Sequence, residues 1–96
     1  MSCKVEWLPE SLSDMARLFK FLETKNVIAA ERAMKAVSDR VIILKDSPKI
    51  SRLMPDETGR GELIVPFGSG AYIIRYVIEI ESKVVIVRVW HSLEDR

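Results

Sequence analysis

The side chains of this sequence that could do chemistry lie near its C-terminal end. His91 is the only histidine, and histidine is the residue that exchanges a proton most readily near neutral pH. Arg75 and Arg88 are nearby in the sequence and could stabilise the negative charge of a phosphate. A proton donor or acceptor near such cations is the minimum needed for chemistry at a phosphate ester.

No metal site and no cofactor site is predicted. One histidine and one cysteine, Cys3, cannot supply the ligands of a zinc site. The glycine-rich stretch 68–70 does not precede a predicted helix, as a phosphate-binding loop requires. The sequence also offers no base beside Cys3 that would activate its thiol as a nucleophile.

The composition predicts a single domain over residues 1–96. With 15 basic and 14 acidic residues, the formal net charge of +1 provides no strong field that would attract nucleic acid. A single cysteine fits a reducing compartment. The chain start lacks the apolar segment of a signal peptide, and no apolar run is long enough to span a bilayer. We therefore expect a cytoplasmic protein without membrane contact.

The candidate residues belong to a stretch, residues 71–90, whose alternation is typical of a β-hairpin. Every even position from 72 to 80 is apolar or aromatic. In the second arm the apolar positions are odd, namely Val85, Val87 and Val89. Successive strand side chains point to opposite faces, so these two sets are expected to form one buried face.

Bringing the two sets together requires an even-numbered loop, most simply Ser82-Lys83. This register places Arg75 opposite Trp90 and Arg88 opposite Val77, and it puts His91 on the buried face. The second face is unusually apolar for a water-facing surface, because it also carries Ile73, Val77, Val84 and Ile86. A half-apolar face with two arginines and a tryptophan is typical of a surface that binds a partner.

The preceding part of the chain predicts elements that would cover the buried face. Alternation over residues 3–7 indicates a short strand. A helix is expected from Pro9. Its apolar face would be Leu12, Met15, Phe19 and Leu22. Asn26 is expected to cap a second helix over residues 27–45. Its stripe would be Ala30, Ala33, Val37, Val41 and Leu44.

After a loop over residues 49–61, residues 62–67 form a further strand candidate. The element order is therefore β-α-α-β-β-β. The predicted class is α+β, with an antiparallel helical hairpin packed on one face of a small, mainly antiparallel sheet.

Several stretches of this sequence together resemble the RelE/ParE toxin superfamily of bacterial toxin–antitoxin systems. They are VEWLPESLSDM, NVIAAERAMKAV, the loop SPKISRLMPDETG, RGELIVPF, the GAYIIRY segment and the ending VRVWHSLEDR. The ending is more similar to the ParE branch, which includes plasmid-stabilisation toxins. The resemblance implies a type II toxin with a cognate antitoxin as partner, and it allows a toxin dimer within the antitoxin complex.

The two branches imply different targets. ParE-like toxins are associated with inhibition of DNA gyrase by binding, without chemistry of their own. RelE-like toxins resemble endoribonucleases that cut mRNA on the ribosome. Attack of a 2′-hydroxyl on an RNA phosphate needs a base, an acid and a cation. If this chain is such an enzyme, its catalytic residues are expected to be Arg75, Arg88 and His91. A third alternative is a non-toxic member that only binds its antitoxin.

We rank the gyrase inhibitor first. RelE-like enzymes typically place basic residues at positions that are occupied here by Ile73, Ser92 and Leu93. The expected face of His91 and the small net charge favour the same ranking. No catalytic residue is then expected. The expected partner-binding residues are Arg60, Arg75, Val77, Ile86, Arg88 and Trp90.

Overall fold

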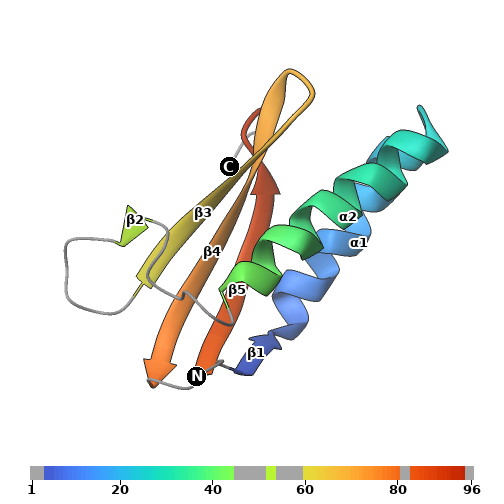
Figure 1. Cartoon of the computed structure of the whole chain (residues 1–96). Helices are drawn as coiled ribbons and strands as arrows, with labels where there is room; N and C mark the ends of the chain where they lie inside the picture. The colour runs from blue at the N-terminus through green and yellow to red at the C-terminus, as the bar shows by residue number, and fades with distance from the viewer. Residues whose placement is uncertain (1–3, 45–51, 54–59, 81–82, 95–96) are drawn as a thin grey trace.

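Residues 4–44, 52–53, 60–80 and 83–94 are described by a computed structural model of the chain (Figure 1). The elements in chain order are β1 (Lys4–Trp7), α1 (Pro9–Glu23), α2 (Val27–Ile43), β2 (Arg52–Leu53), β3 (Arg60–Phe67), β4 (Gly70–Ile80) and β5 (Lys83–His91). The two helices lie side by side against one face of the sheet (Figure 1). The predicted α+β class and element order are confirmed, with β2 as an additional short strand in the stretch predicted as loop.

Three predicted boundaries lie outside the described residues. They are the start of the first strand at Cys3, the last helical residue Lys45 and the loop residue Ser82. The other predicted loop residue, Lys83, belongs to β5.

The second helix forms as its sequence predicts. The Asn26 side chain accepts a hydrogen bond from the Ala29 N–H at 3.1 Å, which is the expected N-cap. The predicted stripe is buried along its whole length, at Ala30, Ala33, Val37, Val41 and Leu44.

The first helix begins at Pro9, as predicted, but its buried face is rotated from the predicted one. Leu12 is 55% exposed, so its predicted place in the core is wrong. Met15 and Leu22 do pack against the core. The fully buried positions of α1 are Ser11, Asp14 and Leu18. The rotation follows from the polar contacts of Asp14 described below, which hold that carboxylate against β5.

The strands form one sheet in the order β1-β5-β4-β3-β2. β1 runs parallel to β5, and the other neighbours are antiparallel, which makes the sheet mixed but mainly antiparallel. The core lies between this sheet and the helices. Its largest fully buried side chains are Tyr72, Tyr76, Leu44, Ile74 and Ile86.

A bulge in β5 changes which of its residues face the helices. Arg75 lies opposite Arg88, whereas Tyr76 lies opposite Ile86, so Val87 is an extra residue on β5. The core residues of β5 are therefore Val84, Ile86 and Val89. Of the predicted set, Val89 is correct. Val85 is buried, as predicted, but it lies outside this core cluster, and Val87 is only half-buried.

The predicted pairing across the hairpin is also wrong. Trp90 lies opposite Ile73, and Arg88 lies opposite Arg75 instead of Val77. Because both alternating sets of β5 are apolar through residues 84–87, periodicity could not reveal the bulge.

Candidate partner-binding face

The face of the sheet opposite the helices, which we call the open face, carries apolar and charged rows of side chains that cross the strands. One row is apolar and joins Ile64 of β3, Ile73 of β4 and Trp90 of β5. Ile64 is 47% exposed, and the other two side chains are half-buried. We call these three residues the apolar row. Neither α1 nor α2 covers it, since both helices lie on the other face (Figure 1).

The neighbouring row is charged and joins Glu62, Arg75 and Arg88 across the same strands. The Arg75 Nη2 donates to Glu62 Oε2 at 2.8 Å. Arg75 and Arg88 lie directly opposite one another, so their charges repel. Glu62 compensates the charge of Arg75, and Asp14 compensates the charge of Arg88. We call these three residues the charged row.

Arg75 links the two rows. Its guanidinium carbon lies 5.0 Å from the centre of the Trp90 ring, in a cation–π arrangement. Within the described part of the chain, Nε of Arg75 is buried and has no hydrogen-bond partner. The side chain is thus held by stacking on Trp90 and by Glu62, which gives the face a fixed cationic centre beside an indole.

Arg88 reaches over the edge of the sheet to helix α1. Its Nε and Nη2 donate to the two oxygens of Asp14 at 2.7 and 3.0 Å, a bidentate pair. The Asp14 carboxylate also accepts the Val89 N–H at 2.9 Å. Arg17 donates to Asp14 and, at 3.4 Å, to the Val89 carbonyl oxygen. Asp14 and Arg17 therefore satisfy both main-chain groups of Val89, as a neighbouring strand would.

This arrangement shifts the ionisation of both partners. Burial of Asp14 favours its neutral form, but hydrogen bonds from Arg88, the Val89 amide and Arg17 outweigh it and lower the pKa of Asp14. The same carboxylate raises the pKa of Arg88. Arg88 consequently forms an internal ion pair with Asp14, although its side chain remains 39% exposed.

His91 lies on the helix-bearing face, as the sequence predicts, where it packs edge-to-face against Tyr72 at 5.1 Å between ring centres. Its Nδ1 accepts the Leu93 N–H at 3.1 Å, and its main-chain N–H donates to Glu94. The ring also sits over Gly70, where an added Cβ would lie 2.6 Å from His91 Cε1. Burial and the charge of Glu94 raise the pKa of Tyr72, so its hydroxyl keeps its proton at neutral pH.

The structure brings together only part of the predicted partner-binding set. Arg75 and Trp90 are in contact, and Arg88 is beside them in the charged row. Val77 is half-buried on the same face, opposite Val85, and exposed Arg60 at the start of β3 pairs with it. Ile86 is fully buried under the helices, so its predicted place on this face is wrong.

Sequence reasoning missed three residues that shape this face, namely Asp14, Arg17 and Glu62. Asp14 could have been found from the sequence, because Ser11, Asp14 and Leu18 follow helical spacing and so share one helix face. A carboxylate buried on such a face requires a cationic partner. Glu62 could have been found only after the β3–β4 register was known. Ile64 was in a predicted strand, but its face was not assigned.

Comparison with known proteins gives the family. A family model described as ParE toxin of type II toxin-antitoxin system, parDE, matches residues 5–96. This chain belongs to the ParE toxin family. The superfamily resemblance inferred from the sequence is thereby confirmed, and membership in a toxin–antitoxin family gives this toxin an antitoxin as partner.

Two individual matches agree with this assignment. Toxin RelE1 of Caulobacter vibrioides (strain ATCC 19089 / CIP 103742 / CB 15) is 34% identical over 83 residues, which is 86% of each chain. A solved structure described as the chromosomal ParDE TA system from P. aeruginosa has a TM-score of 0.72 and covers 92% of this chain and 94% of that one. Its sequence identity is 13%, so it supports the fold alone.

The described residues of this ParE-family toxin contain no group of three metal-ligating side chains. No described helix is long and apolar enough to cross a membrane.

Proposed function

We propose that this ParE-family toxin acts by binding DNA gyrase in the cytoplasm, and that a cognate antitoxin holds it in check. The system would be of the plasmid-stabilisation type. A second copy of the toxin within the antitoxin complex is part of the same proposal.

The observation that carries the proposal is the separation of the candidate catalytic groups. His91 lies on the helix-bearing face, with Nδ1 engaged by Leu93. Arg75 lies on the opposite face of the sheet, against Glu62 and Trp90. A phosphate held at Arg75 would therefore be separated from the imidazole by the sheet itself, and general acid–base catalysis needs hydrogen-bond reach.

The open face has instead the properties of a protein-binding surface. Arginine and tryptophan contribute most to interface energetics, and here they stack at the centre of the face. We propose that an amphipathic antitoxin segment lays apolar side chains on the apolar row and matches its charges to the charged row. Such a segment would fold on binding, and its contact would stabilise the toxin by mass action.

The second candidate is ribosome-dependent mRNA cleavage. The observation that favours it is the 34% identity to a protein named Toxin RelE1. In that reading, His91 would be the acid or base, and Arg75 and Arg88 would hold the phosphate.

Two assays on the purified toxin separate these functions. Inhibition of supercoiling by purified gyrase, retained in His91→Ala, is the result expected of a binding toxin. Cleavage of mRNA on ribosomes, lost in both His91→Ala and Arg75→Ala, would establish the ribonuclease instead. If expression without antitoxin leaves bacterial growth unchanged, the chain is the non-toxic antitoxin binder.

A further inference from the structure

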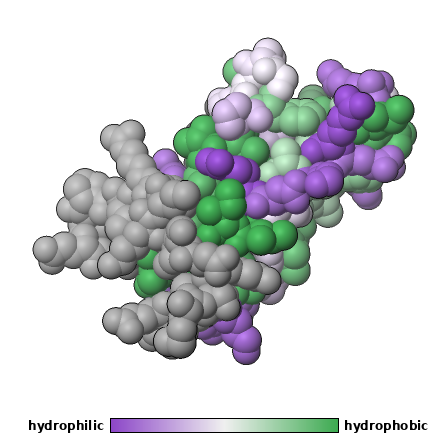
Figure 2. Space-filling model, viewed as in Figure 1, coloured by the Kyte–Doolittle hydropathy of each residue, from purple (hydrophilic) through white to green (hydrophobic). Residues whose placement is uncertain are grey.

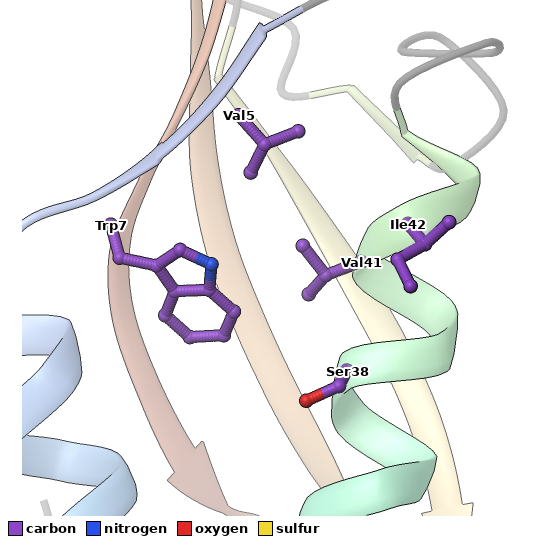
Figure 3. Close-up of a pocket in the computed structure, with 5 residues that line it drawn as sticks. All are labelled: Val5, Trp7, Ser38, Val41 and Ile42. Atoms are coloured by element: carbon purple, nitrogen blue, oxygen red, sulfur yellow. The ribbon is translucent and has the colours of Figure 1, made fainter.

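The border strand β1 and the hollow beside it form a second surface, separate from the open face. The hollow has a volume of about 220 Å³ and is lined by Val5, Trp7, Ser38, Val41 and Ile42. Val5 and Trp7 project from β1 toward α2, and the three other side chains come from α2 (Figure 3). Hydrophobic surface is visible around the C-terminal end of α2 (Figure 2), where Ile42 is 54% exposed.

Among the described residues, no strand pairs with the outer edge of β1. The Leu8 N–H donates to the Ile86 carbonyl of β5 at 3.1 Å. In a parallel ladder, alternate residues direct both main-chain groups to the same neighbour, so Lys4 and Glu6 also face β5. The N–H and C=O of Val5 therefore point away from the sheet, and β1 is its border strand.

We infer that two copies of this chain pair antiparallel through β1, with Val5 opposite Val5 of the second copy. In this register each Val5 exchanges both main-chain hydrogen bonds with its counterpart. The arrangement is a two-fold one, in which the same patch serves both copies. The inference does not depend on which target the toxin inhibits.

Charge complementarity indicates that the partner of the β1 edge is a second copy of this chain. With Val5 at the centre, Lys4 of each copy lies directly opposite Glu6 of the other, on the face away from the helices. Both side chains are exposed, and opposite charges in such positions stabilise strand pairs. The net charge of +1 adds little repulsion between copies. Shifting the register of the two β1 strands by one residue would instead set Val5 of one copy opposite Glu6 of the other. It would also reverse the face to which the side chains of one copy point.

The same two-fold operation places the two hollows side by side on the helix-bearing face. The exposed Ile42 of each copy then borders a shared apolar strip with Val5 and Trp7. A four-residue strand gives a small interface, so association is weak and the measurement has to extend to about 1 mM protein.

Sedimentation equilibrium with charge-swapped variants tests the inference, in reducing buffer so that Cys3 cannot form a disulfide between copies. The wild-type mass should rise with concentration from 11.0 kDa toward twice that value. Lys4→Glu and Glu6→Lys should each remain monomeric, because like charges then face one another across the strand pair. An equimolar mixture of the two variants should dimerise. The β1 strand of Lys4→Glu carries two acidic side chains, and these would face the two basic side chains of Glu6→Lys.

Lys4→Glu keeps the Glu6–Lys83 ion pair, so it serves as the variant least prone to unfold. Lys20→Glu makes the same charge change at an exposed position of α1 and should dimerise like the wild type. A wild type that stays monomeric to the highest concentration would overturn the inference. So would Lys4→Glu dimers as strong as those of the wild type, or a mixture that stays monomeric.

Discussion

Asp14 and Arg88 are 74 residues apart in the chain, yet they form a bidentate ion pair that joins helix α1 to strand β5. The Asp14 side chain is 5% exposed, and the Arg88 side chain is 39% exposed. The pair closes the part of the β5 edge that β1 does not cover, since β1 pairs only as far as Ile86. One contact thus positions the helical hairpin and also orients an arginine of the open face.

Asp14→Ala is expected to destabilise the fold by about 2 kcal/mol, because a buried hydrogen bond to a charged group is lost and the Val89 N–H loses its acceptor. The free energy of unfolding from urea titration is the measurement. Asp39→Ala is the matched control, since Asp39 forms an exposed pair with Lys35, and it should leave that free energy nearly unchanged. Equal losses in the two variants would contradict a special role for Asp14.

The stabilisation by Asp14 should depend on pH in a defined direction. The folded-state pKa of Asp14 is lowered, so the carboxylate contributes fully above the unfolded value of about 3.9. That contribution is lost as the pH falls through the folded-state pKa. The difference in unfolding free energy between the wild type and Asp14→Asn should therefore be constant from pH 7 to 5 and shrink below about pH 4. A difference that persists unchanged to pH 2 would mean that the ionised form of Asp14 is not what stabilises the fold.

The parts of the fold that sequence predicts well are those set by local rules. The stripe of α2 repeats every three or four residues, and Asn26 marks its start, so both are visible within one helix. Three even positions of β4 are predicted correctly for the same reason, since Tyr72, Ile74 and Tyr76 are buried.

The parts that sequence could not predict depend on contacts between distant segments. The bulge at Val87 leaves no local trace in a run of valines and isoleucine, yet it moves Ile86 into the core and sets Arg88 opposite Arg75. The ion pair with Asp14 depends on the packing of α1 against β5. The predicted arginine-bearing face therefore exists, but its pairing and its carboxylates emerge only in three dimensions.

Gly61 is expected to tolerate no side chain. An added Cβ would lie 2.5 Å from Cζ and 2.6 Å from the hydroxyl oxygen of Tyr76, which is fully buried. Gly61→Ala should lower the free energy of unfolding by about 1–3 kcal/mol through overpacking. Ser69→Ala, at an exposed turn position, is the control and should have almost no effect. An unfolding midpoint of Gly61→Ala equal to that of the wild type would show that Tyr76 moves aside without cost.

Ile64→Lys should separate binding on the open face from folding. Ile64 is 47% exposed at one end of the apolar row, so a lysine there can extend into solvent without disturbing the core. In the proposed complex it would instead bury an unpaired charge against the antitoxin, and affinity should fall at least about tenfold. Titration calorimetry with the cognate antitoxin is the measurement, with thermal melting to confirm an intact fold.

Ile28→Lys is the matched control, because Ile28 is 62% exposed on the helical hairpin, on the other side of the molecule. The same charge is added there, so a general electrostatic effect on the antitoxin would appear equally in both variants. Loss of affinity in Ile64→Lys alone locates the antitoxin on the apolar row. Loss in Ile28→Lys alone would move the binding surface to the helices, because only a contact there could sense the added lysine.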